Sequence, residues 1–288
     1  MAGAARKWFI GCGIGCGLML LLAVIGGTIG YFGVRKAVDR GERIEAGFDD
    51  LRDMYGGPAE FTPEPDGAVA TSRMLAFLAA RDAMAADRQK AGDILRTLDG
   101  IEVDGRQPSF LDKARAGFEL IPVMMDFIDN RNQALMDSGI GLGEYLYIYS
   151  MSYFNLLGKP LSDGPSFTLT SDDEGEDNHG FHWDAGGKGN SEDTRADREK
   201  TIRRYLHRVQ LRMAFNQLDA LDARGGSQED RARLSAEIAL MESEPLRLLW
   251  ETGLPPALAQ SLDPYRGQLE ASYDPMINVL ESGLVESE

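Results

Sequence analysis

Cysteine is nearly absent from the chain. Its 288 residues include two, Cys12 and Cys16, and both lie in one apolar stretch near the start of the sequence. The other residues therefore have no cysteine with which to form a disulfide framework or a thiolate metal site. Two cysteines placed in this way do not indicate whether the chain works in an oxidising or a reducing compartment.

Histidine and catalytic motifs are also scarce. Of the three histidines, His179 and His182 are close in sequence, while His207 lies in a charged segment where we expect it to be exposed. The sequence has no G-x-S-x-G nucleophile elbow and no complete phosphate-binding glycine motif. Carboxylate chemistry, as in glycoside cleavage, stays open, but 46 acidic residues do not single out a pair. The sequence favours a protein that acts by binding over an enzyme.

Basic residues are outnumbered by acidic ones. Residues 1–36 hold four basic side chains and no acidic one, so the remaining residues have 26 basic and 46 acidic side chains, a net charge of −20. A region this acidic repels phosphate backbones, and we expect no nucleic-acid binding. A basic protein is the partner that the charge favours. The simpler explanation, that excess acid keeps a helical domain soluble, also stays open.

One long apolar run is present, from Trp8 to Phe32, and it holds no charged residue. As a helix it would be about 37 Å long, enough to cross a hydrocarbon core of about 30 Å. Basic residues flank both ends: Arg6, Lys7, Arg35 and Lys36. A cleaved secretory signal is the alternative, but the run is longer than a signal core and no A-x-A site follows it. The sequence predicts a single-pass, uncleaved signal-anchor over residues 8–32, after a short basic tail over residues 1–7, with membrane lipid as its partner.

Two signals conflict on the orientation of this anchor. Four basic residues follow the run, and the positive-inside rule would keep them in the cytoplasm: Arg35, Lys36, Arg40 and Arg43. The short N-terminal tail favours the opposite arrangement, in which the tail stays inside and the following region is exported. We expect export, so that the acidic region lies on the extracytoplasmic side.

Glycines recur along the predicted anchor. Gly11 and Gly15, and then Gly26 and Gly30, have the small-xxx-small spacing that lets two membrane helices approach closely. This spacing predicts a homodimer through the glycine face. The alternative is that glycine is simply frequent in membrane helices.

The rest of the chain predicts an all-α fold. Residues 33–57 form an amphipathic stalk and linker, and residues 58–288 an acidic helical domain with a polar loop at about 159–193. Apolar residues at intervals of three and four predict helices over the following ranges: 34–55, 68–98, 194–224 and 228–243. The prolines after residue 244 predict several short helices in place of one long helix.

A helix is also predicted to begin at Ser109, because Asp112 stands three residues later in a capping-box pattern. Its apolar residues are expected to face a core: Phe110, Leu111, Phe118, Ile121, Met125 and Ile128. The stretch from Tyr145 to Leu157 is the most apolar outside the anchor, and its tyrosines alternate as in a strand. Its length and its helical neighbours favour a buried helix, in which each tyrosine hydroxyl finds a partner; an aromatic-lined groove is the alternative.

The polar loop holds the sharpest candidate site. Two weakly strand-like segments, residues 166–170 and 180–184, flank an acidic turn and predict either a small β-hairpin or a disordered excursion. Carboxylates and imidazoles in this loop would suit a divalent metal: Asp177, His179, His182 and Asp184. Because neither the EF-hand order nor the H-E-x-x-H spacing is met, no cofactor is predicted, and a solvated acidic loop without a metal is the simpler explanation. A metal-binding protein or metal-dependent hydrolase is the alternative to a binding or scaffold protein.

A basic helix follows the loop, with its cationic residues close together: Arg195, Arg198, Lys200, Arg203, Arg204, Arg208 and Arg212. These residues could bind an acidic partner or lipid headgroups. Pairing within the domain is the simpler explanation, since Asp197 and Glu199 are in the same helix and the preceding loop can fold back onto it.

Overall fold

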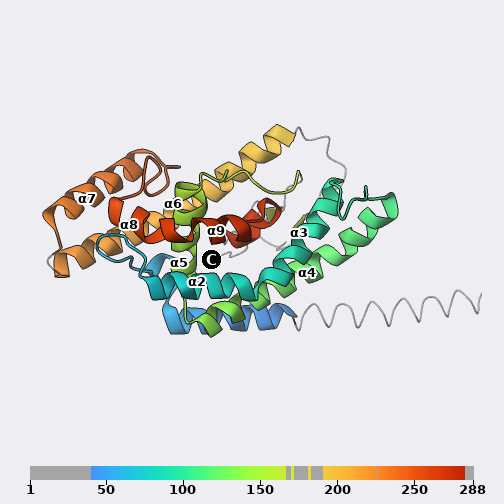
Figure 1. Ribbon diagram of the computed structural model, residues 1–288, viewed down its shortest axis with the longest axis horizontal. Helices are drawn as coiled ribbons and strands as arrows, with labels where there is room; N and C mark the ends of the chain where they lie inside the picture. The colour runs from blue at the N-terminus through green and yellow to red at the C-terminus, as the bar shows by residue number, and fades with distance from the viewer. Residues whose placement is uncertain (1–39, 167–169, 172–180, 183–190, 225, 283–288) are drawn as a thin grey trace, which may run out of the picture. The chain divides into compact units, whose positions relative to one another are not determined.

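The computed structural model describes residues 40–166, 170–171, 181–182, 191–224 and 226–282 (Figure 1). Contacts divide the chain into two units, Met1–Glu45 and Ala46–Glu288. The described residues are predominantly helical, which confirms the predicted all-α class. Within these ranges, no helix is long and apolar enough to cross a membrane. The predicted N-terminal tail and the predicted anchor over residues 8–32 lie outside them.

Of the first unit, the structure describes residues 40–45, which are helical. In the second unit, residues 46–55 are also helical, and their apolar side belongs to the core. Leu51 is buried there, while Phe48 and Tyr55 pack against the buried cluster. The sequence assigned residues 33–57 to a stalk and linker, whereas the contacts join residues 46–55 to the second unit because their apolar side is covered.

Two helices, α2 (Thr71–Ala83) and α3 (Ala85–Asp99), occupy the range predicted as one helix. Met84 separates them. A stripe spaced by three and four residues continues through both helices and is buried throughout: Met74, Phe77, Arg81, Met84, Arg88, Ala91 and Leu95. The second helix ends at Gly100, whose φ of +78° lies in the left-handed region that favours glycine.

The long helix α4 (Phe110–Ser138) packs against α3 and α2 (Figure 1). It begins at the predicted capping box: the Ser109 hydroxyl accepts from the Asp112 amide at 3.3 Å, and the Asp112 carboxylate accepts from the Ser109 amide at 2.8 Å. The helix continues through Pro122 and ends at Gly139, where φ is +68°. Capping therefore fixes both ends of a 29-residue helix.

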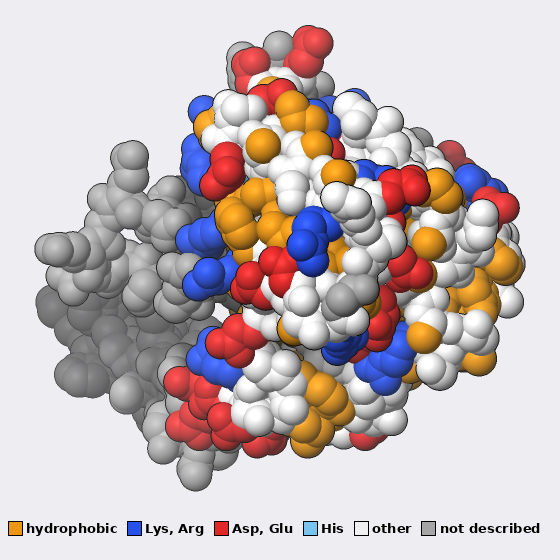
Figure 2. All heavy atoms as spheres, turned by 90° about the vertical axis from the view of Figure 1, so that its left-hand side faces the viewer, with side chains coloured by type: hydrophobic (Ala, Val, Ile, Leu, Met, Phe, Trp, Pro, Cys, Tyr) orange, Lys and Arg blue, Asp and Glu red, His pale blue; other side chains and the backbone are white. Residues whose placement is uncertain are grey.

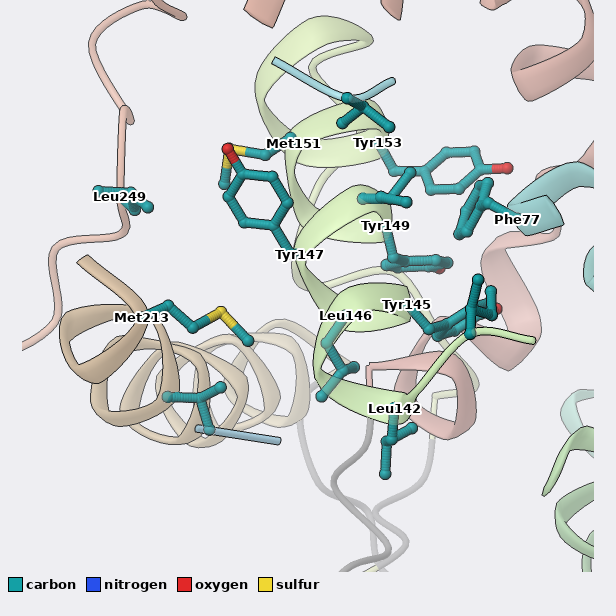
Figure 3. Packing of buried hydrophobic residues seen from close by; sticks show 14 of the residues in the cluster. Phe77, Leu142, Tyr145, Leu146, Tyr147, Tyr149, Met151, Tyr153, Met213 and Leu249 are labelled. Atoms are coloured by element: carbon teal, nitrogen blue, oxygen red, sulfur yellow. The ribbon is translucent and has the colours of Figure 1, made fainter. Parts of the chain in front are cut away.

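The tyrosine-rich stretch forms α5 (Leu142–Tyr149) and the π-helix η2 (Ser150–Leu156), so the prediction of a buried helix is correct. Figure 3 shows Tyr149 and Tyr153 on the side of α5 and η2 that faces Phe77, while Tyr147 points to the opposite side. The strand-like alternation in the sequence has a helical explanation, because residues four apart share one helix face.

A close backbone approach holds α5 against the short 3-10 helix η1 (Pro58–Glu60). A Cβ atom added at Gly143 would lie 2.5 Å from the Pro58 carbonyl oxygen. Glycine therefore allows a contact that any side chain would prevent.

Two short strands, β1 (Thr170–Ser171) and β2 (Phe181–His182), pair antiparallel between η2 and α6. Thr170 is opposite His182, and Ser171 is opposite Phe181. The connection between them lies outside the described residues.

The helices α6 (Ser191–Arg224) and α7 (Gln228–Ser243) pack against each other. The predicted inner residues of α6 are buried: Ile202, Leu206, Val209 and Met213. The Ser227 hydroxyl caps α7 by accepting from the Asp230 amide at 3.0 Å. Figure 2 shows the face around α7, where acidic and basic side chains alternate in small groups, as expected of a solvated surface.

Short helices complete the chain, as predicted from the prolines: α8 (Pro256–Leu262), η3 (Asp263–Tyr265), α9 (Arg266–Ser272), η4 (Pro275–Ile277) and α10 (Asn278–Glu281). Of these, α9 packs on α2 and η4 packs on α3. This return of the chain places Ser272 and Glu281 beside the arginines of α2 and α3.

Candidate functional site

The most unusual surface of the second unit lies on the N-terminal half of α4. Four apolar side chains point into solvent there, with exposed fractions of 83% for Phe110, 76% for Leu111, 85% for Phe118 and 50% for Ile121. We call these four residues the α4 apolar face. Their exposure corrects the prediction that they face a core.

The correction has a physical cause, because α4 is apolar on two sides. The side that packs on α2 and α3 is formed by other residues: Ala116, Leu120, Val123, Met124, Phe127, Ile128 and Leu135. Ile128 is the predicted core residue that does lie on this buried side, and Met125 is half-buried. Burial of one side leaves the other side of the first three turns in water.

Polar contacts at its N-terminus hold this part of α4 in place. The Asp112 carboxylate accepts hydrogen bonds from the hydroxyl and the amide of Ser109, and from the Arg106 guanidinium at 2.8 Å. These bonds hold the pKa of Asp112 well below its usual value. The first turn is therefore capped by a carboxylate that stays ionised. The α4 apolar face is thus displayed on an ordered helix.

A second notable feature is a buried ionic cluster between α2, α3 and α10. Arg81 Nη1 donates to Glu281 Oε1 at 2.9 Å, and Arg88 Nε lies 3.5 Å from the same oxygen. Both guanidiniums also donate to the Ser272 carbonyl oxygen. Burial alone would lower the pKa of Arg81, but Glu281 and the neighbouring tyrosines raise it well above its usual value. Arg81 therefore stays charged beside the buried Glu281 side chain.

The hydroxyls of the tyrosines of α5 and η2 are all paired, and Tyr145, Tyr149 and Tyr153 lie beside the ionic cluster. Tyr145 accepts from Arg81 at 3.0 Å, Tyr147 donates to the Gly67 carbonyl at 2.8 Å, and Tyr149 donates to Asn278 Oδ1 at 2.9 Å. The hydroxyls of Tyr153 and Ser272 share a bond of 2.8 Å. The prediction that each hydroxyl finds a partner is confirmed, and the cluster has a structural role.

The burial of these tyrosines predicts a loss of stability in alkali. Desolvation raises the pKa of Tyr145, Tyr147, Tyr149 and Tyr153 above the ordinary value of about 10. A folded-state pKa above the unfolded one contributes stability that is complete below about pH 10 and is lost as pH rises further. We expect tyrosinate absorbance to rise in two steps, with the second step coinciding with loss of helical circular dichroism. A single step with the fold intact would contradict this.

A cleft of about 260 Å³ opens beside Arg203 of α6, between η2 and the segment that follows α7. Arg203 Nε donates to Glu199 Oε1 at 2.8 Å, and its Nη1 donates to Glu251 Oε1 at 2.7 Å. The acidic partners thus neutralise the guanidinium. The cleft is large enough for a small polar group, but the Arg203 guanidinium is already paired with Glu199 and Glu251.

The basic helix predicted from the sequence is part of α6, and some of its arginines pair within the second unit. Arg198 is buried and donates to the carbonyl oxygens of Ser162 and Pro165. With Arg203 paired as described, internal pairing is confirmed for these two residues. His207, which was expected to be exposed, is half-buried, and its Nδ1 lies 2.7 Å from the Arg247 carbonyl oxygen.

The other sites predicted from the sequence lie mainly outside the described residues. This holds for Asp177, His179 and Asp184 of the candidate metal site, while only the backbone of His182 is described, in β2. It also holds for the predicted helix contacts in the membrane: Gly11, Gly15, Gly26 and Gly30. Among the residues that the structure does describe, no group of histidine and acidic side chains is placed to hold a metal ion. The metal site stays a prediction.

The buried ionic cluster was missed from the sequence, although a signal for it exists. Arg81 and Arg88 occupy positions of the buried stripe that continues through α2 and α3, where apolar residues stand before and after them. An arginine at such a position needs buried hydrogen-bond acceptors, and a carboxylate is the acceptor that also balances its charge. The partner, Glu281, is 200 residues from Arg81 along the chain, so its identity could not be inferred.

Comparisons of the chain with protein-family models, curated proteins and solved structures find no match. Its function is therefore inferred from its own residues and their geometry.

Proposed function

We propose that the chain is a single-pass membrane protein whose helical second unit acts by binding, as a scaffold and not as an enzyme. The α4 apolar face is the observation that supports this proposal. Large apolar side chains clustered on a water-facing surface are unfavourable in an isolated domain and typically mark an interaction site. An ordered, capped helix displays them, so they are available without refolding.

Two other features are more consistent with binding than with catalysis. The buried ionic cluster pairs its side chains with one another in the core, away from solvent. The cleft beside Arg203 is lined by charges that neutralise one another, with Glu199 and Glu251 on the same guanidinium. Neither feature offers a nucleophile beside a general base, which is the arrangement that most hydrolases need.

The anchor belongs to the same proposal and is supported by the uncharged run from Trp8 to Phe32. The acidic second unit would be exported, and a basic protein is the soluble partner that its net charge favours. A homodimer through Gly11, Gly15, Gly26 and Gly30 would add a contact within the membrane.

Carbonate extraction of membranes from expressing cells tests the anchor. The unaltered chain should stay in the membrane pellet and be released only by detergent, because the apolar run cannot leave the bilayer at high pH. A Leu20→Arg, Leu22→Arg variant should move largely to the supernatant, since each buried charge opposes insertion. A matched Leu20→Ile, Leu22→Ile variant should remain in the pellet. Release of the unaltered chain by carbonate would refute the anchor.

A further inference from the structure

The α4 apolar face is narrow and continuous. At 100° per residue, Phe110, Ile121, Phe118 and Leu111 fall within an arc of about 100° on a helical wheel. Ala114 and Gly117 lie within or beside this arc and add no charge to it. A helix with such an arc, ordered and facing water, has the form of an interfacial helix that lies in the plane of a membrane surface.

The charge around the arc favours lipid over a basic protein. Residues 106–121 have three basic side chains and two acidic ones, whereas the chain after residue 36 has a net charge of −20. Arg106 and Arg115 are ion-paired with Asp112 and Glu119 on the same segment. This part of the acidic unit therefore does not repel phosphate headgroups, and basic side chains beside an apolar arc are typical of helices at membrane surfaces.

The size of the face is sufficient for a bilayer contact. Four apolar side chains, each partly exposed, offer roughly 400–500 Å² of surface. Insertion into a bilayer interface needs no minimum area, because affinity grows with each apolar side chain that leaves water.

The proposed anchor would bring a bilayer within reach of this face. Within the second unit, the helix over residues 46–55 lies beside the C-terminal part of α4, with Gly47 beside Asn132 and Tyr55 beside Gly141, which follows the end of α4. Phe118 is about 21 Å along α4 from Asn132. The seven residues between the apolar run and residue 40 can span up to about 25 Å, and the helical residues 40–45 add about 9 Å. A tether of this length keeps the second unit at a high effective concentration near the membrane surface, so that a weak contact is sufficient.

We infer that the α4 apolar face inserts into the interface of the bilayer to which the N-terminal run anchors the chain. The inference rests on the proposed function, since the anchor supplies the membrane. It gives the second unit two attachments, one across the bilayer and one at its surface, which would hold the cleft beside Arg203 at a fixed orientation to the membrane.

Spin-label accessibility in the full chain tests this inference. The label is placed at Phe118→Cys in a Cys12→Ala, Cys16→Ala background, and the chain is reconstituted into phosphatidylcholine vesicles. Leu240→Cys on α7, also an exposed apolar position, is the matched control. Collisions are measured with oxygen, which concentrates in hydrocarbon, and with a water-soluble nickel chelate. We expect the oxygen-to-nickel ratio at position 118 to rise severalfold on reconstitution from detergent, with no change at position 240.

Each other outcome overturns the inference. If the label at position 118 stays as accessible to nickel as the label at position 240, the α4 apolar face lies in water. A label shielded from both reagents shows a protein contact, and spin–spin broadening that disappears on dilution with unlabelled chain identifies a second copy. Flotation of the vesicles separates the two proposals: a chain that fails to float refutes the anchor, whereas a floating chain with a water-exposed label refutes only the α4 contact.

Discussion

Replacing Glu281 by glutamine should lower the free energy of unfolding by about 3–5 kcal/mol, the usual cost of removing one partner from a buried ion pair. Glu281 is fully buried and is the carboxylate that faces both Arg81 and Arg88. Without its charge, two guanidiniums remain in the core with no buried anion beside them. Denaturant unfolding of the full chain in detergent micelles, followed by helical circular dichroism, measures the loss.

Glu119→Gln is the matched control for this substitution. Glu119 also accepts from an arginine, Arg115 Nε, at 2.8 Å, but that pair lies on the surface of α4. Exposed pairs contribute between zero and about 1 kcal/mol. Equal losses in the two variants would show that the buried cluster is not what holds α2, α3 and α10 together.

Replacing Tyr149 by alanine should cost about 3–5 kcal/mol, as expected for an aromatic side chain removed from a packed core. Its ring centre lies 4.6 Å from that of Tyr153 and 6.0 Å from that of Tyr145. The Arg81 guanidinium lies 5.4 Å from the same ring centre, within the range of a cation–π contact. The alanine variant loses these contacts together, and the same unfolding measurement reports the loss.

Two further variants separate the contributions at this position. Tyr149→Phe keeps the ring but removes the donor to Asn278 Oδ1, so it should cost about 1–3 kcal/mol. Phe118→Ala removes an aromatic ring of similar size from the α4 apolar face and should change stability by no more than about 0.5 kcal/mol in micelles. A large loss at Phe118 would mean that the face is part of the core.

Several helix boundaries were predictable because they depend on local chemistry, whereas the break at Met84 between α2 and α3 was not predicted. Ser109 with Asp112 and Ser227 with Asp230 mark starts, and Gly100 and Gly139 mark ends through their left-handed conformation. The tyrosine-rich stretch was also predicted correctly as a buried helix, because its length outweighed its strand-like alternation. Each of these features is decided within a few residues of the chain.

The packing partners were not predictable in the same way. Phe110, Leu111, Phe118 and Ile121 have the spacing of a buried face, but α2 and α3 cover the opposite side of α4. Periodicity shows that a helix has an apolar side without showing which of two such sides is covered. For the same reason, the pairing of Arg81 with Glu281 depends on how the C-terminal helices return to α2.

Protease added to intact expressing cells, after removal of the outer barrier, tests the central claim most directly. The proposal predicts that the acidic second unit is digested from outside while a short N-terminal fragment stays with the membrane. Protection of the second unit until detergent lysis would contradict its export, and recovery of the intact chain in the soluble fraction would contradict the anchor itself.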